Sequence, residues 1–325
     1  MQEIRDDMKI ALFTPYLPYP LDSGGKIRSW HLLRALAKRF EVALYTFYDC
    51  EPPPASAVKA VEESCVSVTF FSRARDWSKR GLIKSILTPP PLLVKYFLVP
   101  AAMEQFHRDL ESRHYDLIIA DELCMAPYPE ISPDLPRIII RQKVDSVHYR
   151  EAAKSRPWGF EKALELIEAY RLARYERDKM PPFQACVACS EEDASLIRDS
   201  APHLPCLVIP NGVDLTSFRP ASQSKPAAPV LLFVGSMNYL PNIDAVEFFF
   251  STIYEKIRRA VPAVKVQIVG HSPPDSIINL SQLDGVTVIG SVPDVRPYYD
   301  QAAVTIVPLR MGGGTRLKIV ESMAM

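Results

Sequence analysis

Short apolar runs along the chain alternate with longer segments in which apolar residues recur every three to four positions. The runs are typical of strands buried on both faces of a parallel sheet, and the spaced segments are typical of amphipathic helices. This alternation predicts a doubly wound α/β architecture. In order, the first part of the chain predicts strand 9–13, helix 26–39, strands 42–47 and 66–71, helix 102–113, strands 115–120 and 137–141, helix 160–179, and strands 185–189 and 206–209.

Residues 220–229 interrupt this pattern with a polar, proline-rich stretch that predicts a linker. We therefore predict two domains, one over 1–219 and one over 230–325. Strands of the second domain end at a glycine or another small residue, which suits a ligand lying along that edge. The elements predicted there are strand 230–234, helix 241–260, strands 264–269 and 286–289, helix 294–301 and strand 304–307.

The last stretch, 308–325, places three glycines between a strand and the start of a helix. Glycines let the backbone approach a ligand closely, and free N–H groups at a helix start attract anions. Two cations in a first turn oppose the helix dipole, so an anion beside them explains them better. A tight turn with solvated basic residues is the alternative. The predicted phosphate-binding residues are Gly313, Gly314, Thr315, Arg316 and Lys318.

Gly24 and Gly25 open the first predicted helix in the same order of strand, glycines and helix, with Lys26 and Arg28 beside them. We interpret the two glycines as a further anion contact, and a simple sharp turn is the alternative. They do not complete a GxGxxG motif, so the sequence does not support a dinucleotide fingerprint.

Polar residues follow two later strands of the first domain. Asp121 and Glu122 end the strand 115–120, and strand 137–141 delivers Lys143, Asp145 and His148 to the same side. Ligands bind at such carboxyl ends of open parallel sheets. The acids are equally suited to cap the loop, and a single histidine after a strand is more often structural.

Composition narrows the possible partners. The 325 residues suggest about two domains, and 38 basic against 38 acidic residues leave no net charge to favour nucleic acid or an acidic membrane. Six scattered cysteines fit a reduced cytosolic setting, and we interpret Cys186 and Cys189 as buried thiols. No signal peptide or membrane-spanning run is evident. Residues 72–100 mix basic and apolar side chains, which suits either packing on the domain or contact with a membrane surface.

Several motifs follow one another along nearly the whole chain. They are Gly24-Gly25, IPNGVDLTSFRP at 209–220, LFVGS at 232–236, QIVG at 267–270, VIGSV at 288–292 and the loop 312–321. Together and in this order they resemble the family-4 glycosyltransferases. The GGGTRLK variant resembles a bacterial subgroup of sugar transferases linked to exopolysaccharide assembly.

This resemblance implies a GT-B fold, in which two Rossmann-like domains face a cleft. It also implies a retaining transfer from a nucleotide-sugar donor to a glycan or lipid-linked acceptor, with no metal or other cofactor, in the cytoplasm or at the inner face of the membrane. The glycine loop, Arg316 and Lys318 then meet the charge of the departing diphosphate. Glu321 matches the acid that holds the ribose hydroxyls. The further ribose- and base-side residues implied are Gly235, Ser236, Gly270 and Val292.

The chain departs from the family pattern in several places. The first acid of the paired-glutamate motif falls on Gly313, and the family's Arg and Lys after the linker strand fall on Ser236 and Pro241. The catalytic histidine of the N-terminal domain has no secure counterpart, and Asp145 and His148 are the nearest candidates. The sequence also stops inside its last predicted helix, so we expect a truncated chain with an incomplete second domain.

Two other functions compete with sugar transfer. A GT-B epimerase acting on a sugar nucleotide would need an acid–base pair near the donor sugar. A non-catalytic fragment that only binds nucleotide sugars is the second alternative. A NAD-dependent dehydrogenase is disfavoured, because no strand is followed by GxGxxG and a later acid for the ribose.

Overall fold

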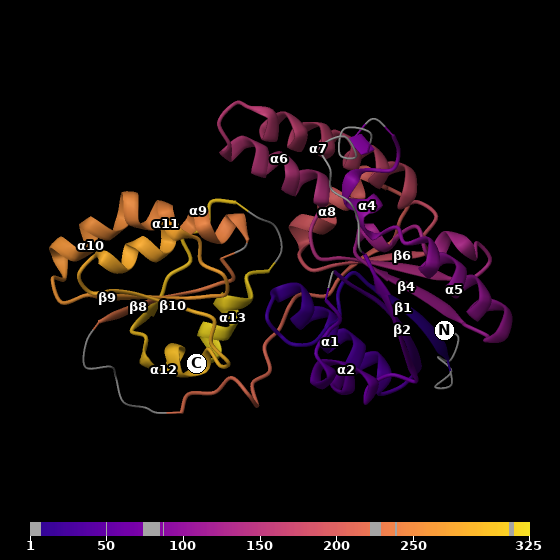
Figure 1. The fold of residues 1–325 in the computed structure, drawn as a ribbon, viewed down its shortest axis with the longest axis horizontal. Helices are drawn as coiled ribbons and strands as arrows, with labels where there is room; N and C mark the ends of the chain where they lie inside the picture. Colours follow the sequence, from indigo (N-terminus) through magenta and orange to yellow (C-terminus); the bar gives the residue numbers. More distant parts are fainter. Residues whose placement is uncertain are drawn as a thin grey trace. The chain divides into compact units, whose positions relative to one another are not determined.

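A computed structural model of the chain describes residues 8–49, 51–73, 85–86, 88–221, 229–237, 239–311 and 315–325. It divides into two compact units, Met1–Pro210 and Asn211–Met325 (Figure 1). Residues 211–221 pack with the second unit, since Arg296 Nη1 donates to the Ser217 carbonyl at 3.0 Å and the Ala221 N–H donates to Asp300 at 3.1 Å. The unit boundary therefore falls earlier along the chain than the domain limit predicted at 219.

The first unit is built on a parallel sheet with strand order β3-β2-β1-β4-β5-β6-β7. Chain order reverses between β1 and β4, which lie side by side although they are far apart in sequence. In doubly wound sheets ligands bind outside the carboxyl ends of the strands at such a switch point. The strands are β1 (Lys9–Thr14), β2 (Glu41–Tyr48), β3 (Ser67–Ser72), β4 (Leu117–Asp121), β5 (Arg137–Arg141), β6 (Ala185–Ala188) and β7 (Cys206–Val208), all at predicted positions.

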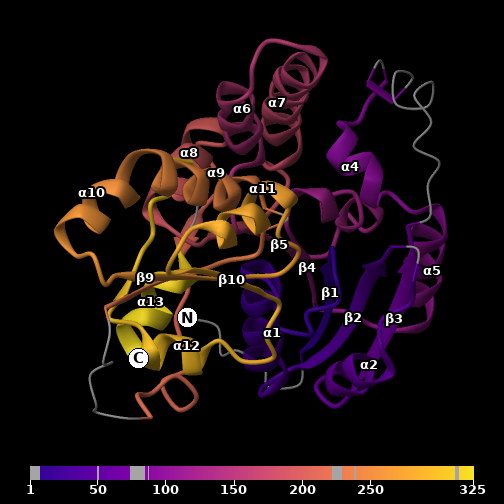
Figure 2. The same cartoon turned by 60° about the vertical axis from the view of Figure 1, so that its left-hand side comes forward.

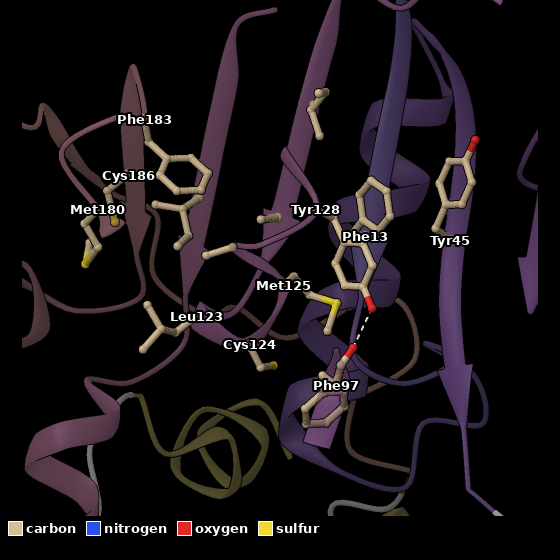
Figure 3. Packing of buried hydrophobic residues seen from close by; sticks show 14 of the residues in the cluster. Phe13, Tyr45, Phe97, Leu123, Cys124, Met125, Tyr128, Met180, Phe183 and Cys186 are labelled. Carbon is tan, nitrogen blue, oxygen red and sulfur yellow. Dashed lines mark hydrogen bonds between the residues drawn. The ribbon is translucent and has the colours of Figure 1, made fainter. Parts of the chain in front are cut away.

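Helices cover both faces of this sheet, and each face has its own apolar core. Helices α1 (Gly24–Ala37) and α2 (Ala55–Glu62) pack on one face. The opposite face carries the larger core, in which the Phe13 ring stacks between Tyr45 at 4.7 Å and Tyr128 at 4.9 Å (Figure 3). Helices on this second face are α4 (Leu92–Phe97), α5 (Pro100–Ser112), α7 (Phe160–Lys179) and α8 (Glu191–Ser200), with the short 3-10 turns η1 (Leu123–Met125) and η2 (Pro129–Ile131).

Helices α6 (Asp145–Ser155) and α7 form a packed pair (Figure 1). The sequence predicted α7 at its observed bounds but assigned no element to the residues of α6. Few of these residues are apolar, and the Ser146 hydroxyl of α6 donates to Glu176 of α7. Of the mixed basic and apolar stretch 72–100, the part 74–84 lies outside the described residues. Its end forms α4, whose Val94 and Phe97 are buried in the core of the unit.

The second unit has a parallel sheet with the order β10-β9-β8-β11 and a switch point between β8 and β11. Its strands are β8 (Val230–Val234), β9 (Lys265–Val269), β10 (Val286–Gly290) and β11 (Val304–Thr305). One face carries α9 (Leu240–Phe248), the π-helical turn η3 (Phe249–Ile253), α10 (Tyr254–Ala260), α11 (Asp275–Ile278) and the 3-10 turn η4 (Asn279–Gln282). The other face carries α12 (Arg296–Gln301) and α13 (Leu317–Ala324) (Figures 1 and 2).

Two elements of this unit differ from the prediction. The helix predicted over 241–260 is interrupted by the π-helical turn, and the strand predicted over 304–307 pairs with β8 only at Val304 and Thr305. None of the helices within the described ranges is long and apolar enough to cross a bilayer.

Candidate functional site at the sheet edges

In the second unit, Lys318 lies in the first turn of α13 with its ammonium group directed into the protein. Its Nζ donates to Asn242 Oδ1 at 2.9 Å and lies 4.2 Å from the centroid of the Phe233 ring on β8. Burial, and secondly the charge of Arg316, lower the pKa of Lys318 to about 7. A cation held in this way gains from an anion, because a negative charge beside it restores its preference for the protonated state.

Two glycines make this arrangement possible. A Cβ placed on Gly235 would lie 2.8 Å from both Lys318 Nζ and Asn242 Nδ2, so the space of a side chain is taken by these two groups. A Cβ on Gly270 would lie 1.8 Å from the carbonyl oxygen of Gly235. The backbone after β8 therefore packs directly on the backbone after β9, which is the kind of close approach that requires glycine.

Glu321 lies one turn beyond Lys318 on α13 and is partly buried. Its Oε2 accepts a hydrogen bond from the Tyr299 hydroxyl of α12 at 3.0 Å. Burial raises the pKa of the Glu321 carboxyl, although the Tyr299 hydrogen bond and the charge of Lys318 oppose this shift. One carboxylate oxygen is thus held by Tyr299, and the carboxylate keeps acceptor capacity for hydroxyl groups of a ligand.

The remaining predicted residues of this unit fall into three groups. Gly313 and Gly314 lie outside the described residues. Thr315 and Arg316 precede α13, with Arg316 at its N-cap position. Ser236 follows β8 and accepts a hydrogen bond from Asn242 Nδ2 at its carbonyl, 2.8 Å away, and Val292 packs against an apolar cluster that contains Tyr299.

Sequence reasoning missed several neighbours of these residues. Asn242 contacts both Lys318 and Ser236, and Tyr299 binds Glu321. His271 Nδ1 and Ser291 Oγ lie 2.8 Å apart at the carboxyl ends of β9 and β10. No local motif marks these side chains, and only their position after a strand or on a helix facing the sheet edge could have suggested them.

In the first unit, Gly24 and Gly25 are the first residues of α1, as predicted. Ser29 on α1 bonds to the Asp121 carboxylate at the end of β4, and its Oγ lies 3.0 Å from the Gly25 carbonyl. Gln142 Nε2, just after β5, donates to Asp121 Oδ1 at 3.2 Å. These contacts fix the glycine start of α1 against the ends of β4 and β5, so the glycines lie at the switch point of the sheet.

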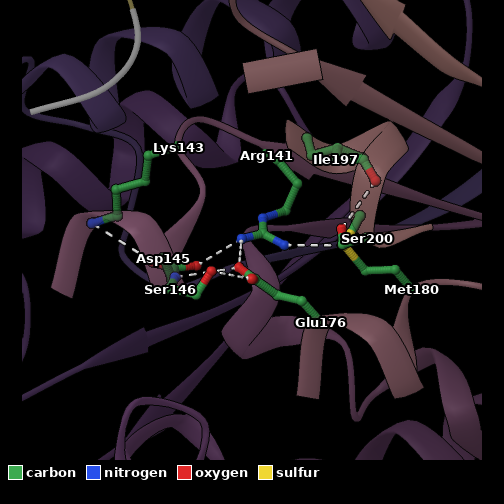
Figure 4. A network of polar contacts seen from close by, with 8 residues as sticks. All are labelled: Arg141, Lys143, Asp145, Ser146, Glu176, Met180, Ile197 and Ser200. Atoms are coloured by element: carbon green, nitrogen blue, oxygen red, sulfur yellow. Dashed lines mark hydrogen bonds and ion pairs between the residues drawn. The ribbon is translucent and has the colours of Figure 1, made fainter. Parts of the chain in front are cut away.

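Asp145, one of the two predicted catalytic residues, is the first residue of α6 and belongs to a buried polar network (Figure 4). Arg141 Nη2 lies 3.0 Å from Asp145 Oδ2 and 2.7 Å from Glu176 Oε1, and the Ser146 hydroxyl donates to the other Glu176 oxygen at 2.5 Å. The network joins β5, α6 and α7. Its geometry gives Asp145 a structural task, and the catalytic assignment stays a prediction.

His148, the second predicted catalytic residue, lies one turn further along α6 and is half-buried. Burial, and secondly the charge of Lys143, lower the pKa of His148 to about 4, so the imidazole is neutral at pH 7. The thiols of Cys186 and Cys189 are buried, as predicted, and the Cys189 thiol donates to the Gln142 carbonyl at 3.0 Å.

Comparison with known proteins adds family information to this geometry. A family model described as Glycosyltransferase Family 4 matches residues 23–217, and one described as Glycosyl transferases group 1 matches residues 228–325. No curated protein sequence matches the chain significantly.

Solved structures with similar folds include several that contain nucleotides. A mutant of S. aureus TarM, in complex with fondaparinux, alpha-GlcNAc-glycerol and UDP, matches 98% of this chain and 84% of its own at 10% identity and a TM-score of 0.61. An E. coli trehalose-6-phosphate protein bound with UDP-2-fluoro glucose matches 97% and 81% at 11% identity and a TM-score of 0.57. Medicago truncatula UGT71G1 complexed with UDP-glucose matches 99% and 79% at 13% identity and a TM-score of 0.55. At these identities the likeness establishes the fold, which is GT-B.

Proposed function

Because the chain belongs to glycosyltransferase family 4, we propose that it moves a sugar from a nucleoside-diphosphate sugar to a hydroxyl group of a glycan or lipid-linked acceptor. The single observation that carries the donor assignment is Lys318, a cation held at the switch point of the second sheet with its pKa lowered to about 7. The UDP and UDP-sugar complexes of proteins with the same fold support a nucleotide in this role.

The chemical task in such a transfer is to stabilise the charge that develops on the departing diphosphate. Lys318 and Arg316 supply positive charge at the start of α13, where the helix dipole also favours an anion. We assign the diphosphate to this helix start and the ribose hydroxyls to Glu321. Gly235 and Gly270 shape this site, because their missing side chains leave room for Lys318 and for the backbone after β8.

We further propose that the transfer retains the anomeric configuration and needs no metal, since protein cations and N–H groups take the charge that a metal would otherwise carry. Treatment with EDTA is then expected to leave the transfer rate unchanged, whereas a metal-dependent site would lose activity that Mg²⁺ or Mn²⁺ restores. Proton NMR of the first product formed would show the anomeric configuration directly.

The cellular setting of this proposal rests on the GGGTRLK loop, which resembles that of bacterial sugar transferases in exopolysaccharide assembly. An acceptor of that kind is a growing glycan on a lipid carrier, and we place the reaction at the inner face of the membrane. Copurification of the chain with membranes, and its release by high salt, would support this setting.

Thermal-shift titration with UDP, GDP and ADP tests the donor site. A ligand that binds only the folded state raises the melting temperature. At a free ligand concentration of 100 times Kd the folded state gains about 2.7 kcal/mol of stability. We expect one nucleotide to stabilise the chain, and Lys318→Gln to abolish the shift. Lys256→Gln, which changes an exposed lysine on α10, is the matched control and keeps the shift.

Turnover then separates sugar transfer from its alternatives. A transferase releases nucleotide from the matching nucleotide sugar faster when an acceptor is added. A fragment that only binds would show the thermal shift without turnover, and an epimerase would convert the sugar while it stays attached to the nucleotide. Either result would replace sugar transfer as the function of this site.

A further inference from the structure

Glu122 has the most unusual backbone conformation in the first unit. Its φ is 82° and its ψ is 156°, a region that is essentially restricted to glycine. The Glu122 N–H donates to the Ile140 carbonyl at 2.8 Å, so the strand beside it holds the backbone in place. A glutamate kept where a glycine would relieve strain indicates that its side chain is needed.

The Glu122 side chain is also unusual, because it lacks a partner. Within the described part of the chain its carboxylate makes no hydrogen bond or ion pair, and Oε2 is fully buried. The residue as a whole remains partly exposed, so the carboxylate can be reached from the surface. Buried polar atoms of native proteins nearly always have partners, and an exception at a sheet edge points to a ligand that supplies one.

The surroundings of Glu122 favour a proton on its carboxyl group. Burial is the largest cause, the charge of Asp145 is the second, and together they raise the pKa of Glu122 to about 8. A base whose pKa lies near the working pH is the most effective in catalysis. The other ionisable groups that face Glu122 are Asp121 on β4, Cys124 on η1, Arg141 on β5, Lys143 after β5 and Cys186 on β6.

Glu122 follows β4 directly, at the switch point of the first sheet beside the start of α1. We propose that Glu122 is a catalytic residue that binds the reacting hydroxyl of the acceptor and takes its proton. The inference rests on the proposed function. The acceptor oxygen forms a bond to the anomeric carbon, the bond from that carbon to the diphosphate oxygen breaks, and the electron pair leaves with the diphosphate. The proton moves to the Glu122 carboxylate and passes to solvent after product release.

Neighbouring acids are less suited to this role. Asp121 is already bonded to Ser29 and Gln142, and Asp145 is bonded to Arg141. His148 has a pKa of about 4, which makes it a weak base. Glu122 combines a carboxylate without a partner among the described residues, partial exposure of the residue and a pKa near neutral pH.

Nucleotide release from UDP-glucose, GDP-mannose and ADP-glucose tests the proposal, with water and with simple saccharides as acceptors. For the unsubstituted chain we expect kcat/KM to rise with pH as the Glu122 carboxylate forms, and to fall at higher pH as Lys318 loses the proton with which it binds the diphosphate. Glu122→Gln should lower kcat/KM at least about 100-fold and remove the rising limb, whereas the falling limb stays. Glu104→Gln, which changes an exposed glutamate on α5, is the control and should match the unsubstituted chain.

Glu122→Gly ensures that loss of activity is not mistaken for loss of folding. Glycine adopts this backbone conformation without strain, so the variant should melt at a higher temperature and still lose at least about 100-fold in kcat/KM. Both Glu122 variants should keep the thermal shift with nucleotide, because the donor residues lie in the other unit.

Three outcomes decide between the interpretations. Equal kcat/KM and an equal pH profile in Glu122→Gln would overturn the role of Glu122 alone. A rising limb that persists in Glu122→Gln would also overturn it, since another group would then supply the base. If the unsubstituted chain releases no nucleotide from any of the three donors, the proposed function fails and the role of Glu122 fails with it.

Discussion

The two units use the same parallel architecture, but their sheet edges carry opposite chemistry. At the switch point of the first sheet, Glu122 is an acid whose pKa is raised to about 8. At the switch point of the second sheet, Lys318 is a base whose pKa is lowered to about 7. In both places burial disfavours the charged form of a single side chain. In our proposals one edge takes a proton and the other receives an anion.

The two edges also differ in how the backbone accommodates this chemistry. The first edge forces a glutamate into a conformation suited to glycine, and a buried ion network around Arg141 supports the neighbouring elements. The second edge uses real glycines, Gly235 and Gly270, and Lys318 occupies the space that they leave. The first edge has a strained backbone at Glu122, and the second has closely packed backbones at Gly235 and Gly270. Different substitutions should therefore destabilise the two edges.

The largest effect is expected from Arg141→Met, which removes the centre of the buried network in the first unit. Asp145 and Glu176 would then be left as buried charges without their cation, at a cost of about 3–5 kcal/mol in the free energy of unfolding. Urea denaturation measures this loss. Arg174→Met breaks an exposed pair with Asp178 and should change stability by at most about 0.5 kcal/mol. Equal losses in the two variants would show that the network is not a support of the first edge.

Gly270→Ala should be the next largest change, and it affects the second unit. The new Cβ would lie 1.8 Å from the Gly235 carbonyl oxygen, so the backbone must shift, with an expected loss of about 1–3 kcal/mol. The same shift would displace Gly235 from Lys318 and weaken nucleotide binding in the thermal-shift titration. Gly212→Ala meets nothing within 4 Å and serves as the control.

The pH dependence of stability should have opposite signs at the two edges. The folded state holds a proton on Glu122 that the unfolded chain loses, so stability falls as pH rises from about 4.5 to about 8. In the folded state Lys318 binds its proton less tightly than in the unfolded chain. The free energy of unfolding therefore rises as the pH increases from about 7 to about 10.5. Glu122→Gln should remove the first slope and Lys318→Gln the second, each on the order of 1 kcal/mol per pH unit. Urea titrations of both variants at pH values from about 4 to about 10 measure these slopes. If a variant changes the free energy of unfolding outside the pH range given for its residue, the pKa shift assigned to that residue is rejected.

Tyr299→Phe should have the smallest effect. It removes one hydrogen bond to Glu321 and should cost about 0.5–1.5 kcal/mol in stability. If Glu321 binds the ribose, loss of this partner should also change nucleotide affinity, while Tyr298→Phe on the same helix should not. Calorimetric titration with the stabilising nucleotide measures both variants, and unchanged affinity in Tyr299→Phe would argue against a ribose contact that Tyr299 positions.

Local sequence patterns determined much of this architecture. Apolar runs located the strands because residues buried on both faces of a parallel sheet must all be apolar. Gly24 and Gly25 marked the start of a helix, and Gly235 and Gly270 marked strand ends, where a Cβ would meet Lys318 and the Gly235 carbonyl respectively. Lys318 stood out because it lies with Arg316 in the first turn of a helix after a glycine loop, and Glu321 stood out through the family resemblance. These signals are local, so the sequence alone contained them.

Only the tertiary structure decided the chemistry of the first edge. Helix α6 was missed because Arg141 and Glu176, which are far apart in sequence, hold it through polar contacts that leave no apolar stripe. The strain of Glu122 is a property of φ and ψ, imposed by the pairing of β4 with β5, and its proton affinity depends on Asp145 from another element. Burial and charge proximity arise only once the chain is folded, because they depend on distances between residues that the linear order does not fix.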